Sequence, residues 1–198
     1  MKKYVGVILS TLPPSMMVVN KVLGRVGVYL YITLFPVVII YLLWRFEEEI
    51  RSRVSDLERR TVLAVLLVVL LGLVLSFIFV YPIADAGAYG GGSDADDALN
   101  VAVEALLSGE YPYYAKTYLD NPITPLPGAI FLAVPFVLLG TSAYQNFLWV
   151  PVLYALFSIH LGSSKRALFA FLFTLLASPS ILHFFLIGSD KLSNSIYV

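Results

Sequence analysis

The chain of 198 residues contains no cysteine and only two histidines. The lack of cysteine excludes disulfide bonds, thiol nucleophiles and thiolate metal sites. Thirteen basic and 13 acidic residues leave no formal net charge, so nothing in the composition indicates a nucleic-acid partner. The histidines, His160 and His183, lie in separate apolar stretches and do not form a metal-binding set. No segment repeats at a fixed period, which excludes a solenoid.

Long apolar runs dominate the chain. Hydrophobic residues make up 59% of it, and the mean hydropathy is +0.85. Residues 61–80 are free of charged side chains and long enough to cross a hydrocarbon core of about 30 Å as a helix. Residues 26–44 and 167–187 have the same character. The sequence therefore predicts an all-α, polytopic membrane protein in contact with the lipid bilayer.

The remaining apolar segments are shorter or interrupted. Residues 4–19 follow Lys2 and Lys3 like the start of a signal peptide, but no small-residue cleavage site follows them. The pair Pro13-Pro14 predicts a short or kinked first span, or an interfacial segment. Residues 126–140 are near the length expected of a re-entrant or interfacial segment, and residues 144–161 form a further run. Together these segments predict about five to six membrane segments.

Residues 45–60 are densely charged and separate an N-terminal region, residues 1–60, from residues 61–198. Glu47 and Arg51, Glu49 and Arg53, and Asp56 and Arg60 are spaced four apart, which favours a solvated helix. Arginine in a short loop marks the cytoplasmic side of a membrane protein. The sequence therefore predicts a multi-pass protein of the cell membrane, with residues 81–125 on the external side.

This external loop, residues 81–125, is the one long polar segment of the chain. Its only cation is Lys116, and it contains seven carboxylates, Asp85, Asp94, Asp96, Asp97, Glu104, Glu110 and Asp120. The spacing of apolar residues predicts a short amphipathic helix over 95–108, with Ser93 or Asp94 as its cap and Gly109 just past its end. One interpretation is that the acids only cap this helix and favour its dipole.

The side of the membrane on which Asp190 lies depends on the later segments. Three full crossings between residues 126 and 187 would place the end of the chain in the cytoplasm. Lys165 and Arg166 instead favour a cytoplasmic break at 162–166, which places Asp190 outside. We favour the second arrangement.

A combination of motifs in residues 61–198 resembles a known family. A helix opened by an aspartate runs into Ala-Leu-Leu-Ser-Gly-Glu-Tyr-Pro-Tyr at 105–113, and the proline-rich stretch 121–127 leads into the next apolar segment. This order resembles the first external loop of the glycosyltransferase C superfamily, which uses polyprenyl-phosphate sugars. In that family an essential aspartate precedes the glycine by about fifteen residues, a spacing that corresponds to Asp94. Ala95 stands where many relatives have glutamate, so Asp97 remains a rival.

The resemblance implies inverting transfer of a sugar from a polyprenyl-phosphate donor to an acceptor glycan, lipid or protein on the external face. Asp94 or Asp97 would be the general base, and Asp190, 96 positions after Asp94, would correspond to a second external carboxylate. Some relatives bind a divalent metal such as Mg or Mn, for which Asp94 and Asp190 would be the ligands. Substrate contacts are expected from four further residues: Asp96, Lys116, Lys191 and His183.

Relatives in this superfamily have about twice as many spans. The resemblance therefore implies that these residues correspond to an N-terminal part that would not turn over substrate alone. Two other classes compete with the enzyme. A non-catalytic membrane scaffold or assembly subunit would use the acidic loop to bind a partner. A transporter fragment is disfavoured, because transporters tend to place ionisable groups inside their spans and the clearest spans here contain none.

Overall fold

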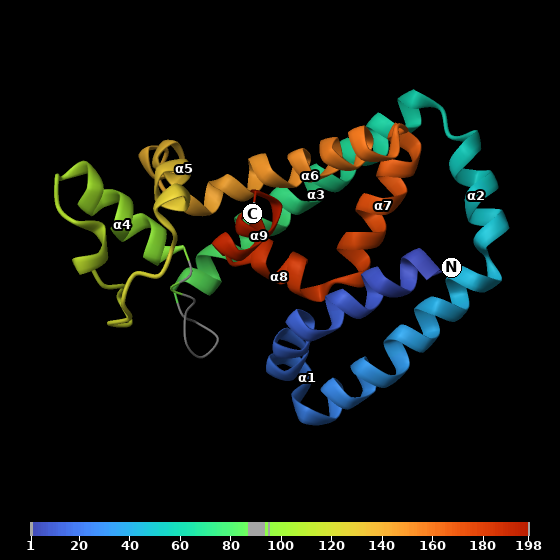
Figure 1. The fold of residues 1–198 in the computed structure, drawn as a ribbon, viewed down its shortest axis with the longest axis horizontal. Helices are drawn as coiled ribbons and strands as arrows, with labels where there is room; N and C mark the ends of the chain where they lie inside the picture. The colour runs from blue at the N-terminus through green and yellow to red at the C-terminus, as the bar shows by residue number, and fades with distance from the viewer. Residues whose placement is uncertain (1, 87–93, 95, 198) are drawn as a thin grey trace. The chain divides into compact units, whose positions relative to one another are not determined.

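The computed structural model describes residues 2–86, 94 and 96–197, and this part of the chain is helical, without a strand (Figure 1). The long α-helices are α1 (Lys2–Arg45) and α3 (Arg59–Asp85), joined by α2 (Glu47–Asp56). The polar loop contains α4 (Asp97–Leu107) and the 3-10 turn η1 (Pro112–Tyr114). The remaining elements are α5 (Pro127–Leu138), the 3-10 turn η2 (Ser142–Tyr144), α6 (Gln145–Leu161), α7 (Ser164–Ala177), α8 (Pro179–Leu186) and α9 (Asp190–Tyr197).

Two helices in the described part of the chain are long and apolar enough to cross a membrane, Leu12–Arg45 and Arg59–Asp85. Their large apolar side chains are exposed, as expected of surfaces that face lipid. Two bent pairs raise the number to as many as four spans: Pro127–Leu138 with Ser142–Leu161, bent by 100°, and Ser164–Ala177 with Pro179–Leu186, bent by 83°. The all-α membrane class is confirmed in this coarse form, while five to six segments stays a prediction.

The first apolar segment lies in α1, which is helical at the pair Pro13-Pro14. α1 continues through Pro13 and Pro14 and is broken at Gly24, whose φ of 66° lies in the left-handed region. Glycine adopts this conformation without the steric cost that a Cβ atom brings. The break therefore lies at Gly24, and a kink at the proline pair stays a prediction.

The charged segment forms a helix, α2, as predicted. Of the three expected ion pairs, Glu49 and Arg53 lie 3.9 Å apart, with both side chains largely exposed. Asp56 ends α2 and Arg60 lies in α3, so these two residues do not share the helical face that the spacing implied.

The apolar run 167–187, predicted as a span, consists of two helices bent by 83° relative to each other. α7 ends at Ala177, Ser178 takes a non-helical conformation, and α8 begins at Pro179, which has no backbone N–H to continue the ladder. Serine hydroxyls lie at the break: the Ser178 and Ser180 hydroxyls are 2.9 Å apart, and the Ser180 amide donates to Ser15 Oγ at 3.4 Å. Such side chains satisfy backbone groups that a broken membrane helix frees.

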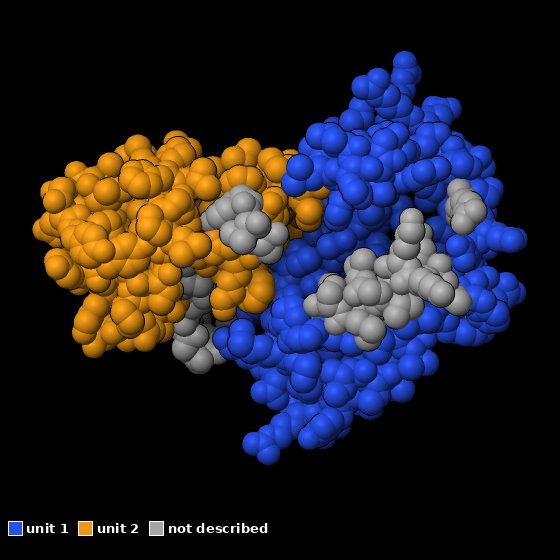
Figure 2. Space-filling model, viewed as in Figure 1, with its two compact units in different colours: residues 1–68, 154–183 blue, residues 69–153, 184–198 orange. Residues whose placement is uncertain are grey.

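The chain divides into two compact units, shown in Figure 2. Unit 1 comprises residues 1–68 and 154–183, and unit 2 comprises residues 69–153 and 184–198. The sequence predicted a division along the chain at residue 60, whereas each compact unit combines segments that are far apart in sequence. The division at residue 60 stays a prediction.

In unit 2, α4 packs on α5 and forms a small apolar core. Leu99, Ala102 and Val103 of α4 are fully buried, and Ile130 and Ala133 face them from α5. The amphipathic helix predicted over 95–108 is thus present as α4, with Gly109 at φ 77° just past its end. This core holds the start of α4, where the carboxylates are concentrated.

Candidate functional site

Asp94 precedes α4 and is held by a tight turn of the polar loop. Its Oδ2 accepts hydrogen bonds from Thr117 Oγ1 at 2.9 Å and from Asn121 Nδ2 at 2.7 Å. Asp96 occupies the N-cap position of α4 and its side chain makes no cap hydrogen bond. The prediction that the Asp94 side chain caps the helix was wrong. Its carboxylate accepts hydrogen bonds from Thr117 and Asn121 instead. Ser93, the other predicted cap, lies outside the described residues.

The turn at residues 117–121 holds both of the competing aspartates. The Asp120 amide donates to the Thr117 carbonyl at 2.8 Å, and the Asn121 amide donates to Thr117 Oγ1 at 3.2 Å. The Tyr118 amide of the same turn donates to Asp97 Oδ2 at 2.8 Å. Because α4 begins at Asp97, Asp94 and Asp97 do not share a helical face. The turn, and not the helix, brings the two carboxylates together.

The environment of Asp94 favours its ionised form. Hydrogen bonds from Asn121 and Thr117 outweigh partial burial and lower the pKa of Asp94, and the positive charge of Lys191 lowers it further. The carboxylate is only partly buried. Both side-chain hydrogen bonds end on Oδ2, and no side chain in the described part of the chain donates to Oδ1. The two side-chain hydrogen bonds therefore fix the carboxylate through Oδ2.

Asp96 lies in a water-poor network two residues later. Asp96 is 2% exposed, and its carboxylate accepts a hydrogen bond of 2.6 Å from the Tyr81 hydroxyl. The Tyr81 hydroxyl also lies 3.2 Å from Thr141 Oγ1. Burial raises the pKa of Asp96 to about 6, although the Tyr81 hydrogen bond opposes that rise. The Asp96 carboxylate is thus enclosed by its own hydrogen-bonding partners, and the expected substrate contact at Asp96 stays a prediction.

The same network continues into η2. Asn100 Oδ1 accepts from the Ser142 amide at 2.7 Å, and Ser142 Oγ donates to the Asp96 carbonyl at 3.0 Å. Ser142 is fully buried. These bonds join the start of α4 to η2 and to the end of α3.

Asp190, the second predicted carboxylate, begins α9 after a closely packed glycine. Gly188 has a φ of 71°, and a Cβ atom there would lie 2.5 Å from the Ala143 Cβ and 2.7 Å from the Tyr81 ring. Only glycine fits this approach, which places the start of α9 beside the ring of the tyrosine that binds Asp96. Burial raises the pKa of Asp190, opposed by Asn194, whose Nδ2 donates to Asp190 Oδ2 at 3.0 Å, and by Lys191.

The other predicted substrate contacts separate into different places. Lys191 follows Asp190, is exposed, lies 5.4 Å above the Phe184 ring and acts electrostatically on Asp94. Lys116 is paired with Asp120 at 2.8 Å on the surface of the turn. His183 belongs to unit 1, so the structure does not assign it to the cluster around Asp94.

No group of three or more His, Asp or Glu side chains in residues 2–86, 94 and 96–197 is arranged to hold a metal ion. The structure brings the segments of Asp94 and Asp190 into one unit through the Tyr81 ring and Gly188. The Mg or Mn site predicted at these two residues stays a prediction.

Sequence reasoning missed the residues that hold the acids: Thr117, Asn121, Thr141, Asn100 and Ser142. A weak signal was present, because Asn100 interrupts an apolar helix and Thr141-Ser142 follow a glycine between apolar runs. Their partners lie far away in sequence, so spacing could not reveal them. No protein-family model, curated protein or solved structure matches this chain.

Proposed function

We propose that unit 2 carries part of the active site of a membrane glycosyltransferase that moves a sugar from a polyprenyl-phosphate donor to an acceptor hydroxyl. The observation that carries the proposal is the Asp94 carboxylate, ionised, partly exposed, and held by Thr117 and Asn121 within the electrostatic reach of Lys191. An anionic acceptor for a proton and a cation for a departing phosphate are what such a transfer needs. The resemblance of residues 105–113 to the superfamily's external loop supports the same chemistry.

In this mechanism Asp94 acts as general base. The acceptor oxygen attacks the anomeric carbon and loses its proton to Asp94 Oδ1. The bond between that carbon and the phosphate oxygen breaks, and the lipid phosphate leaves with the electron pair. Lys191 stabilises the negative charge of the leaving phosphate. Asp97 is the alternative base, because the same turn holds it through the Tyr118 amide.

Asp190 and Asp96 have supporting roles in the proposal. Tyr81 and Gly188 connect their segments, so a shift at Asp96 would move the start of α9 and with it Lys191. Asp96 and Asp190 are positioning residues, whereas Asp94 and Lys191 would touch the reacting groups.

Replacement of Asp94 in the chromosomal copy of the gene tests the base. Asp94→Asn should lower sugar transfer in isolated membranes by a factor of about 10² to 10⁴, the usual contribution of a general base, at unchanged protein abundance. Asn121→Ala is the matched variant, because it removes one donor and keeps the carboxylate. It should retain most activity and move the acidic limb of the pH profile upward, since the hydrogen bond from Asn121 lowers the pKa of Asp94.

Full activity in Asp94→Asn would contradict the assignment. Loss of activity in Asp97→Asn alone would transfer the role of base to Asp97.

The proposal also requires the polar loop to lie outside the cell. Ser52 and Lys116 are exposed, and the chain has no cysteine of its own, so single cysteines can be introduced at both positions. An impermeant thiol reagent added to whole cells should label Lys116→Cys and leave Ser52→Cys unlabelled until the cells are permeabilised. Labelling of Ser52→Cys in intact cells would reverse the topology and remove the acids from the external face.

A non-catalytic role has one observation in its favour. Tyr111 and Tyr114 of the loop are 58% and 86% exposed, and their rings lie 5.0 Å apart. Exposed aromatic pairs are typical of interfaces with a protein or with lipid headgroups. If Tyr111→Ser and Tyr114→Ser abolish co-purification of a partner while Asp94→Asn has no effect, the chain is an assembly subunit.

A further inference from the structure

Unit 1 contains a pocket of about 630 Å³ that the carboxylate chemistry does not involve. Its volume falls in the range of small-molecule sites, which is roughly 300–1,000 Å³. The walls come from the end of α1, from α2 and from α7, and they are mostly aliphatic and aromatic: Leu42, Leu43, Phe46, Ile50, Phe169 and Phe173. Such a lining favours a hydrocarbon chain.

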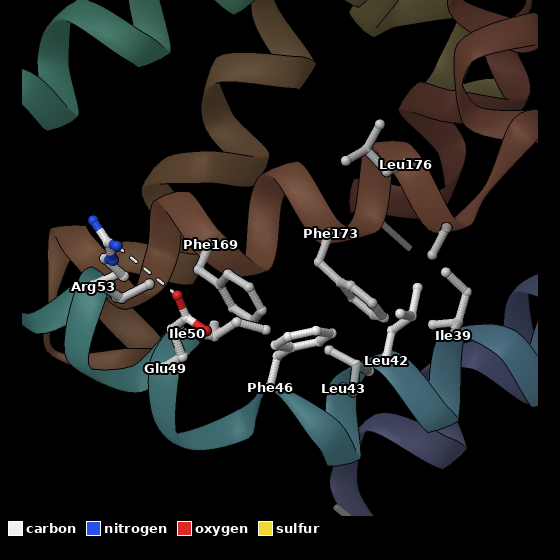
Figure 3. Close-up of a pocket in the computed structure, with 12 residues that line it drawn as sticks. Ile39, Leu42, Leu43, Phe46, Glu49, Ile50, Arg53, Phe169, Phe173 and Leu176 are labelled. Carbon is white, nitrogen blue, oxygen red and sulfur yellow. Dashed lines mark ion pairs between the residues drawn. The ribbon is translucent and has the colours of Figure 1, made fainter.

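The two ends of this pocket differ in polarity. Figure 3 shows Glu49 and Arg53 together at one end, and Ile39 and Leu176 at the other. The Glu49 and Arg53 side chains are 3.9 Å apart and largely exposed. At this end the Lys165 ammonium, at the start of α7, donates to the Ser55 carbonyl of α2 at 2.6 Å. The start of α7 therefore lies at the polar end and its apolar length runs away from it.

The position of the polar end matches a membrane interface. The candidate span Leu12–Arg45 ends at Arg45, and the charged helix α2 begins two residues later. The apolar walls come from this span and from α7, which together with α8 forms one of the two bent apolar pairs. A molecule in the pocket would therefore have its apolar part at hydrocarbon depth and its polar part among the charges of α2.

We propose that this pocket binds an aminophospholipid of the phosphatidylethanolamine type, with one acyl chain between α1 and α7 and the headgroup at Glu49 and Arg53. The charge pattern selects this headgroup. A guanidinium suits a phosphate, and the adjacent carboxylate suits the primary ammonium that follows it in the same headgroup. Phosphatidylglycerol would place a second polar group without positive charge beside Glu49. Phosphatidylcholine has a quaternary ammonium that donates no hydrogen bond.

The test measures lipid binding by the purified, delipidated chain in detergent with native mass spectrometry. Phosphatidylethanolamine, phosphatidylcholine and phosphatidylglycerol with identical acyl chains are titrated separately. Phosphatidylethanolamine should bind about fivefold more tightly than the other two, which corresponds to the upper end of the contribution of an exposed ion pair. Equal affinity for the three lipids, or preference for phosphatidylglycerol, would overturn the proposal.

Variants separate the headgroup from the chain. Glu49→Gln should reduce phosphatidylethanolamine binding to the level of phosphatidylcholine, and Arg53→Gln should weaken all three lipids. Leu43→Trp narrows the apolar wall and should also weaken all three, with folding verified by circular dichroism. Glu48→Gln is the matched control, because Glu48 is exposed on α2 and does not line the pocket. An effect of Glu48→Gln as large as that of Glu49→Gln would show a nonspecific surface charge effect and reject the site.

Discussion

The two units place their polar groups in different ways. In unit 2 the polar side chains around α4 are buried and paired with one another, as in the bonds of Asp96 with Tyr81 and of Asn100 with Ser142. In unit 1 the long helix α1 exposes large apolar side chains, such as Val22 and Val37 at 74% and 65%, and the Glu49–Arg53 pair lies at the surface. A buried charge must be hydrogen-bonded, whereas an exposed pair contributes little to stability. Substitutions in the buried network of unit 2 should therefore affect folding, and those at the exposed pair of unit 1 should mainly affect what binds there.

A glycine in each unit provides the sharpest version of this comparison. Gly188→Ala in unit 2 should lower the free energy of unfolding by about 3 kcal/mol, because a left-handed φ and a clash with Ala143 and Tyr81 add together. Gly162 in unit 1 has a φ of 59°, and a Cβ atom there would have no neighbour within 4 Å. Gly162→Ala should therefore lower the free energy of unfolding only by the backbone cost of about 1 kcal/mol. Thermal melts in detergent measure both. Equal losses would mean that Gly188 packs more loosely than the contacts indicate.

The pH dependence of stability should come from Asp96 in unit 2. Its pKa is raised to about 6, so the folded state holds the proton more tightly than the unfolded chain, and stability falls as the pH rises from about 4 to 6. A shift of roughly two pKa units bounds the effect at about 3 kcal/mol. Asp96→Asn keeps an oxygen for the Tyr81 hydroxyl and should flatten this part of the profile. Denaturant titrations from pH 4 to 8 measure it. An unchanged slope in the variant would assign the dependence to another group.

The smallest effects are expected at the exposed ion pairs, one in each unit. Lys116→Ala removes the pair with Asp120, and Arg53→Ala removes the pair with Glu49. Each should change the stability of the lipid-free protein by less than about 1 kcal/mol. Added phosphatidylethanolamine should then raise the melting temperature of Lys116→Ala and not that of Arg53→Ala. Stabilisation of both variants would place the lipid elsewhere.

The sequence alone determined the membrane character and the main elements. Residues 61–80 predicted α3, residues 45–60 predicted α2, and the periodicity with Gly109 predicted α4, because hydropathy, helical spacing and glycine conformation are local properties. Asp94 was identified from a motif, and its role as base stays a prediction.

Only the tertiary structure decided what surrounds the acids. Thr117 and Asn121 lie 23 and 27 positions after Asp94, and Thr141 lies 60 positions after Tyr81. A hydrogen bond depends on distance and direction in space, and neither can be read from spacing along the chain. The same is true of the breaks: α1 is broken at Gly24, and Ser178 separates α7 from α8, at positions that the sequence pattern did not indicate. At Ser178 the hydroxyls of Ser15 and Ser180 stabilise the break, and folding alone brings Ser15 to that place.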